Sequence, residues 1–133
     1  MGGLLTHLSI ATAGFLIGAF IFKNWKYGLG FFLGSLIPDI IDFGIAGISE
    51  GSLNPSVIMT NPIFHPLAVL GHTWWHWIIF GILVFLVLFL LKKKEKLSKD
   101  KFKVWIITEV FFLAGVYIHL LIDKLVIETS YWI

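Results

Sequence analysis

Apolar residues dominate four long stretches of the chain, and polar or charged residues separate these stretches. The four segments cover about residues 4–22, 28–48, 66–91 and 104–127. Each is close to the roughly 20 apolar residues that a helix needs to cross a bilayer. The pattern predicts an all-α polytopic membrane protein, a four-helix transmembrane bundle that forms a single integral membrane domain over residues 1–133.

Two of the segments carry prolines that refine this prediction. The stretch "GSLIPDIID" places Pro38 and two aspartates inside the second segment. Because proline removes one helical hydrogen bond, we expect the second helix to be broken at Pro38, as a kinked helix or as two half-helices. Pro66 stands where proline is favoured in a first helical turn, so we expect a continuous third helix from Pro66 to Leu91.

Composition narrows the class of protein. Hydrophobic residues make up 58% of the chain and charged residues 14%, whereas a soluble domain has about 25% charged residues. The chain has no cysteine, which excludes disulfides and thiolate metal ligands within it. Any metal ion would therefore be bound by His, Asp and Glu side chains.

The positions of the lysines predict the orientation in the membrane. Lys23 and Lys26 follow the first segment, and a basic loop at residues 92–103 follows the third. These two loops share one side if four segments cross, and positively charged loops favour the cytoplasmic side. We therefore expect an inner (cytoplasmic) cell membrane protein with the N- and C-termini outside. The lysines indicate topology, and we expect no nucleic-acid partner.

Ionisable side chains inside the apolar segments are the candidates for function, because each costs about 2.5–3.5 kcal/mol at the bilayer centre. At about 1.5 Å per residue from the outer end of each segment, all of these candidates lie in the outer half of the membrane. Spacings of three or four residues place the members of a pair on one helix face. We expect a shared metal site built by His7, Asp39, Asp42, His72, His76, His119 and Asp123, with His65 as an additional candidate.

Several polar and small residues also fit structural roles. His65 fits a packing residue at the lipid–water boundary, and Asp39 fits a helix cap after Pro38. Glu109, near the inner end of its segment, is expected to reach the cytoplasmic interface. Glycines four residues apart indicate close packing between helices: Gly14 with Gly18, and Gly30 with Gly34.

Read in order, these motifs resemble a family of small membrane-bound metal-dependent hydrolases, the YdjM-like, LexA-binding inner-membrane-associated family. The family pattern has an early histidine and then PDIDH-like, HRGxTHS-like and HLLLD-like motifs, and the resemblance covers nearly the whole chain. The matching stretches here are "THLSIA", "IPDIID", "GHTWWH" and "HLLID". The third departs most, because no arginine follows His72 and the two histidines are four residues apart.

The resemblance implies a metal-dependent hydrolase. The family is distantly similar to zinc-dependent phospholipases C and single-strand nucleases, which implies a phosphoester substrate. Our leading hypothesis is a hydrolase of a lipid or lipid-linked phosphoester at the extracytoplasmic leaflet. One or two divalent ions, zinc before iron or manganese, would activate water, with catalytic roles for Asp42 as general base and for His76. The expected partners are membrane lipids and the phosphoester substrate.

Three alternatives use the same residues. A metal-ion or proton carrier or channel would also need a broken helix and intramembrane carboxylates and histidines. Such a pathway requires polar groups that continue to the cytoplasmic side. The half of the membrane on that side is expected to contain almost no polar side chain besides Glu109. A metal-binding membrane protein without catalysis would keep the site and lack the chemistry. A bis-histidine haem protein would leave the aspartates without a role.

Overall fold

The computed structural model describes residues 4–51, 60–63 and 65–125, with the side chains at 4, 42, 43, 46, 50, 67 and 68 outside the description. All regular structure in these residues is helical, which confirms the predicted all-α class. Within the described residues before the last segment, the helical elements are α1 (Leu4–Leu16), η1 (Ile17–Ile21), α2 (Trp25–Asp39), η2 (Ile40–Gly44), α3 (Ile45–Glu50), α5 (His65–Gly71) and α6 (Trp74–Lys93), where η marks a π-helical turn. The last segment is the long helix α7 (Lys99–Leu125).

Two of these helices, α6 and α7, are long and apolar enough to cross a membrane. Helix α1 with η1 forms a shorter apolar helix. Only 11% of the most apolar part of α6 is buried inside the protein, so most of this helix presents apolar side chains to its surroundings. A core helix of a soluble protein would be mostly covered, and the exposed surface of α6 therefore favours contact with lipid.

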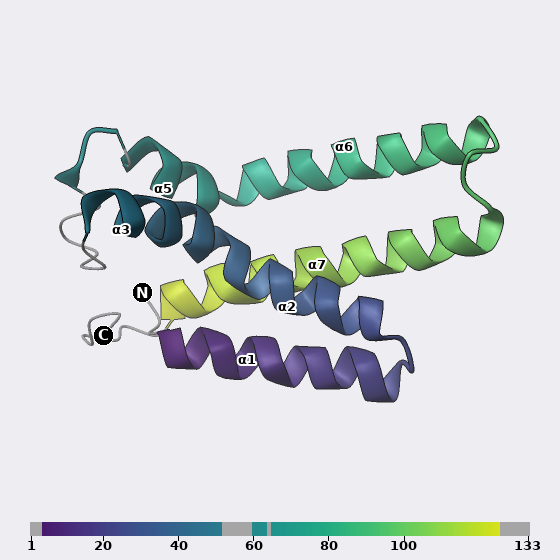
Figure 1. Cartoon of the computed structure of the whole chain (residues 1–133), viewed down its shortest axis with the longest axis horizontal. Coiled ribbons are helices and arrows are strands. Elements are labelled where there is room, and N and C mark those ends of the chain that lie inside the picture. The colour runs from purple at the N-terminus through teal and green to yellow at the C-terminus, as the bar shows by residue number, and fades with distance from the viewer. Residues whose placement is uncertain (1–3, 52–59, 64, 126–133) are drawn as a thin grey trace.

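The second helical segment bends close to Pro38 without being interrupted. Pro38 lies inside α2, whose α-helical geometry ends one residue later, and the chain passes through η2 directly into α3. Proline lacks the N–H that would bond to the carbonyl of Gly34, and a π-helical turn accommodates such a disturbance. The ribbon changes direction between α2 and α3 (Figure 1). Of the two forms predicted for this helix, the kinked helix is the one observed.

The third segment is interrupted where the sequence predicts a continuous helix. Helix α5 ends at Gly71, and α6 begins at Trp74 after an extended Thr73 (φ −101°, ψ 116°). Side chains beyond the break bond to the last carbonyls of α5: Trp77 Nε1–H donates to Gly71 O (2.7 Å), His76 Nδ1 to Leu70 O (3.1 Å), and the Thr73 hydroxyl to Val69 O. These bonds satisfy carbonyls that a helix end leaves without intrahelical partners. His72 therefore lies at a joint between two helices.

Helix α2 lies between α1 and α7, and α6 packs on α7. As a result α1 and α6 lie on opposite sides of the α2–α7 pair (Figure 1). Glycines allow the close approaches: a Cβ on Gly18 would meet the backbone of Gly28, and one on Gly34 would overlap the carbonyl of Phe112. Side chains at Gly14 and Gly30 would also clash with the neighbouring helix. The predicted packing role of the glycine pairs is confirmed.

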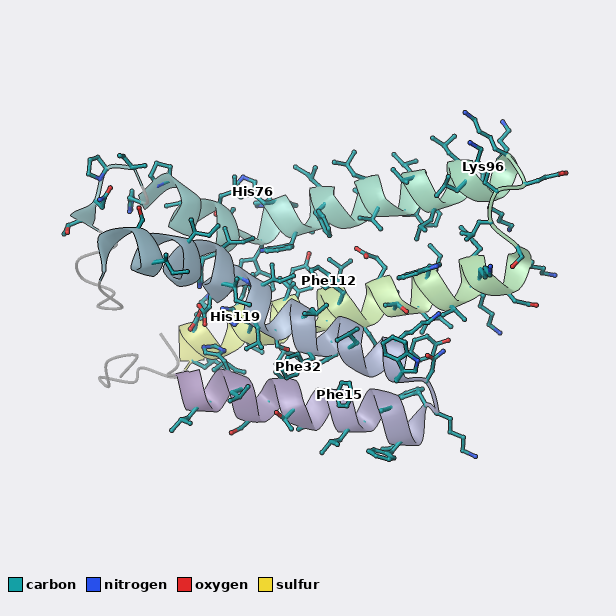
Figure 2. The ribbon with its side chains drawn as sticks, viewed as in Figure 1. Phe15, Phe32, His76, Lys96, Phe112 and His119 are labelled. Atoms are coloured by element: carbon teal, nitrogen blue, oxygen red, sulfur yellow. The ribbon has the colours of Figure 1, made fainter. Side chains whose placement is uncertain are left out.

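The two ends of the molecule differ in chemistry. The turns at 22–24 and 94–98 lie at one end, together with the lysines in and beside them, and α1 begins and α7 ends at the other (Figure 1). Figure 2 places Lys96 at the first end and His119 toward the second. His119 lies twenty positions after Lys99, which corresponds to about 30 Å along α7. Apart from Lys124 in the last turn of α7, the lysines are therefore separated from the polar side chains discussed next by about the thickness of a bilayer's hydrocarbon core.

Candidate metal centre

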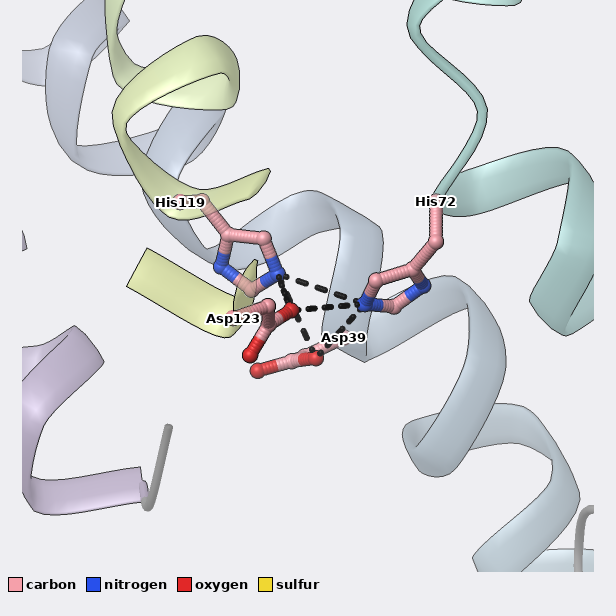
Figure 3. Close-up of side chains that lie close together, drawn as sticks. All are labelled: Asp39, His72, His119 and Asp123. Atoms are coloured by element: carbon pink, nitrogen blue, oxygen red, sulfur yellow. Dashed lines mark hydrogen bonds and ion pairs between the residues drawn. The ribbon is translucent and has the colours of Figure 1, made fainter. Parts of the chain in front are cut away.

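Four side chains from separate parts of the chain converge near the end of α7. Asp39 comes from α2, His72 from the joint between α5 and α6, and His119 with Asp123 from α7 (Figure 3). Each offers one donor atom, and these four atoms all lie within 4.8 Å of one another. Two imidazoles and two carboxylates in this arrangement are a suitable donor set for a zinc, iron or manganese ion.

Asp123 lies at the centre of the contacts. Its Oδ2 is 3.0 Å from His72 Nε2 and 3.2 Å from His119 Nε2. Asp39 Oδ1 is 3.6 Å from His72 Nε2 and 3.5 Å from His119 Nε2. The distance between the two Nε2 atoms is 3.5 Å. The carboxylate oxygens and imidazole nitrogens therefore surround one small volume.

The tautomer of His119 is set by a backbone contact. Its Nδ1 lies 2.9 Å from the carbonyl oxygen of Ser35 in α2, and that oxygen can only accept. Nδ1 therefore carries the proton, and in neutral His119 the lone pair of Nε2 points at the cluster. A hydrogen bond at the far imidazole nitrogen is also the usual support of a metal-binding histidine.

His7 contacts the cluster from α1. Its Nε2 lies 3.1 Å from Asp123 Oδ1, the oxygen on the far side from His72, and its ring lies against the ring of His119 at 4.1 Å between centroids. His7 is buried, and among the described residues its Nδ1 has no hydrogen-bond partner. Since Asp123 Oδ1 is engaged by His7, Oδ2 is turned toward His72 and His119.

Burial makes the charge balance of this cluster important. Asp39 is 2% exposed and His119 1% exposed. The side chain of Asp123 is 10% exposed. One buried and one largely covered carboxylate require compensating positive charge, which a divalent cation or protonated imidazoles would supply. Asp39 Oδ2 is buried without a hydrogen-bond partner in the described part of the chain. The side chain of His72, 22% exposed, marks the side from which the cluster is accessible.

The structure brings together five of the predicted site residues and leaves His65 and His76 apart. His76 is exposed and bonds to Leu70 O, so it does not join the four donors. The helix-spacing argument fails for this pair because His72 lies outside the helix that carries His76. His65 is exposed at the start of α5. The side chain of Asp42 lies outside the described part of the structure, so its expected role stays a prediction.

One contributor has no signal in the sequence. Ser35 acts through its backbone carbonyl, and any residue at this position would provide the same acceptor. The position of Ser35 one helical turn before Asp39 becomes informative only when α2 and α7 are seen to pack together.

Comparisons with known proteins give no information on function, so any proposal rests on the geometry of the site. No protein-family model, curated protein or solved structure matches the chain. The resemblance to membrane-bound metal-dependent hydrolases stays a prediction from the sequence motifs.

Proposed function

We propose that the chain is a membrane-embedded, metal-dependent hydrolase that acts on a phosphoester of a membrane lipid or lipid-linked molecule. The observation that carries the proposal is the group of four donor atoms within 4.8 Å on Asp39, His72, His119 and Asp123. Charged and imidazole groups cost free energy among apolar helices. The convergence of four such groups at one place therefore favours a functional site.

The residues present fit a zinc-type ion. His72, His119 and Asp123 provide two nitrogen donors and one oxygen donor, the number of protein ligands that catalytic zinc sites use. When bound, the ion supplies Lewis-acid chemistry that activates water and stabilises negative charge on a phosphoester. Ser35 and His7 would orient His119 and Asp123 through the contacts described above.

Asp39 has a separate role in this proposal. Its Oδ1 faces the donor atoms, while its buried Oδ2 has no hydrogen-bond partner in the described residues. A carboxylate oxygen in this position can accept the proton of an attacking water molecule. Asp39 is therefore proposed as a fourth ligand or as the general base, alongside the predicted role of Asp42.

The location of the cluster supports a substrate that enters from one face of the membrane. We propose that the four segments all cross the bilayer, with the cluster toward the extracytoplasmic side and the lysine turns in the cytoplasm. His72 lies two residues before α6, whose first residues Trp74 and Trp75 are exposed. Exposed tryptophans favour the level of the lipid head groups, where a phosphoester lies.

A metal-ion or proton carrier receives less support. Glu109 lies on α7 between the lysine end and the cluster. A largely apolar stretch, which includes Phe112, Leu113 and Val116, separates it from His119. A transport pathway needs polar groups along its length. The polar groups of the cluster are therefore better suited to a site that opens on one face.

Metal analysis of the purified protein tests the ion. We expect about one zinc, iron or manganese ion per chain, lost in His72→Ala and Asp123→Ala because each removes a donor. His65→Ala is the matched control, since it removes an exposed histidine outside the cluster. Wild-type protein without stoichiometric metal would contradict the proposal.

Hydrolysis requires a second measurement on the metal-loaded protein. A panel of phospholipids and generic phosphoesters is incubated with wild type and with Asp39→Asn, and released products are quantified by mass spectrometry. We expect turnover by wild type and a loss of about 10²-fold or more in Asp39→Asn, the usual effect of removing a general base. Metal-loaded protein that cleaves none of these substrates would refute the hydrolase and leave a metal-binding membrane protein.

A further inference from the structure

An apolar groove runs along α6 next to the candidate metal centre. Its volume is about 440 Å³, and its walls come from α2 and η2, α5, α6 and α7. The lining residues include Ile37 and Ile41 of α2 and η2, Phe112 of α7, and His76, Phe80 and Leu83 of α6. Every lining residue is apolar except His76. The volume lies within the range of about 300–1,000 Å³ that small-molecule sites occupy.

One end of the groove lies at the joint between α5 and α6, which carries His72. Leu70 and His76, which line the groove, flank His72 in the sequence at the joint between α5 and α6. Phe112, which also lines the groove, lies seven residues before His119 on α7, about 10 Å along the helix. Figure 2 shows His76, Phe112 and His119 in this arrangement. The groove therefore leads from the level of the cluster into the apolar part of the molecule.

The open side of the groove continues into the exposed apolar surface of α6. Phe80 and Leu83 line the groove and are 42% and 56% exposed. Since almost nothing in the groove can bond to water, ordered water is disfavoured there. In a bilayer the available apolar occupant is a hydrocarbon chain, which reaches the groove from the surrounding lipid without crossing a polar barrier.

We propose that this groove binds one acyl chain of a membrane phospholipid and thereby holds its phosphate at the metal centre. Substrates are then recognised by their chain, and a water-soluble phosphoester with the same head group is a poor ligand. The position of the phosphate rests on the proposed function, whereas binding of the chain does not depend on a metal ion.

A second groove at the lysine end differs in character. Its volume is about 410 Å³, it meets the first at Phe112, and it is lined by Lys26 and Glu109 as well as apolar residues. A carboxylate and an ammonium group make this groove unsuitable for a hydrocarbon chain. The acyl chain is therefore assigned to the groove beside the cluster.

Photo-crosslinking of the full chain in detergent tests the proposal. The probe is a phosphatidylethanolamine with a diazirine at the end of one acyl chain, added in trace amounts, and the crosslinked peptides are identified by mass spectrometry. We expect crosslinks at the groove walls in wild type. Leu83→Trp should reduce the yield about tenfold, the effect of losing the burial of about two methylene groups.

Ile82→Trp is the matched control. Ile82 and Leu83 are adjacent on α6 and almost equally exposed, at 55% and 56%, but only Leu83 lines the groove. The control should crosslink as wild type does. Equal yields in the two variants, or crosslinks spread evenly around α6, would overturn the proposal.

Competition in wild-type protein keeps the test independent of whether the variants fold. Unlabelled phosphatidylethanolamine should suppress the crosslink, and glycerophosphoethanolamine, which carries the same head group without acyl chains, should not. Suppression by both compounds would overturn the proposal. Wild-type protein treated with a chelator should still crosslink, so a failure of the metal proposal is distinguishable from a failure of this one.

Discussion

At the scale of single residues, Asp123 divides its two oxygens between different partners. Oδ1 lies against His7, and Oδ2 lies against His72 and His119. His7 is therefore expected to position Asp123, whereas the sequence predicts it as a direct ligand. The two roles differ in how strongly the loss of His7 affects metal binding.

His7→Leu tests which role is correct. We expect the variant to bind the ion with about 10–100-fold lower affinity and an unchanged stoichiometry at saturation, the usual effect of removing a residue that supports a ligand. Titration with zinc against a chelating dye measures both quantities. Ser9→Ala, an exposed substitution on the same helix, should match wild type. Loss of stoichiometric metal, as in Asp123→Ala, would make His7 a ligand.

The sequence predicted most of the residues in the cluster because their cost in a membrane is visible without a structure. His7, Asp39, His72, His119 and Asp123 were all identified by charge or imidazole chemistry inside apolar segments. His76 was grouped with them because four-residue spacing assumes an unbroken helix. The bonds from His76 and Trp77 to the end of α5 depend on side-chain geometry that a hydropathy pattern does not contain.

At the scale of elements, the joint between α5 and α6 is held by side chains. Trp77 is 7% exposed and donates its indole N–H to Gly71 O. This bond ties the beginning of α6 to the end of α5 on either side of His72, so the joint has a defined geometry.

Trp77→Phe should destabilise this joint. The substitution removes the donor and leaves the Gly71 carbonyl without its partner, which costs about 1–3 kcal/mol. Thermal unfolding in detergent measures the change. Trp75→Phe, at a position that is 71% exposed, is the control and should unfold as wild type does. An equal effect of both substitutions would show that the Trp77 hydrogen bond contributes nothing.

The contact between α2 and α7 depends on glycine. A Cβ at Gly34 would overlap the carbonyl of Phe112, whereas one at Gly44 would meet Ile40 Cγ2 at an ordinary 3.5 Å. Gly34→Ala should therefore separate α2 from α7, which carry Asp39 and His119, and cost about 1–3 kcal/mol or more. Gly44→Ala should have little effect. Unfolding and metal content measured together check both, and a Gly34→Ala protein with wild-type stability would contradict the packing described.

At the scale of the whole molecule, the lysine turns and the cluster lie at opposite ends. The sequence predicted this separation from charge and from the depth of the ionisable residues, and the helix directions agree with it (Figure 1). The kink after Pro38 was expected, whereas its π-helical form depends on local hydrogen bonding that residue types alone do not specify. Which helices become neighbours could not be predicted from the sequence either, because it depends on which glycine-bearing helix faces pack together.

Single cysteines test the proposed orientation, and the absence of natural cysteine makes each one a unique reporter. Ile63→Cys lies at the end that holds α5, and Lys96→Cys lies in the turn between α6 and α7. In intact cells a membrane-impermeant maleimide should label residue 63, and residue 96 only after lysis, because lysine-rich turns remain in the cytoplasm. The opposite pattern would invert the orientation, and labelling of both in intact cells would contradict a chain that crosses the membrane between them.

In the proposed metal site, the joint at His72 would also affect how fast an ion enters or leaves. Asp39, His119 and Asp123 are carried by α2 and α7, which glycines hold in close contact. His72 is carried by the joint, so a small rotation of α5 relative to α6 displaces one donor while the other three keep their positions. Three fixed donors favour capture of an ion, and one donor on a joint provides a route for exchange. We therefore expect the lifetime of the proposed ion to depend on the hydrogen bonds that close the end of α5.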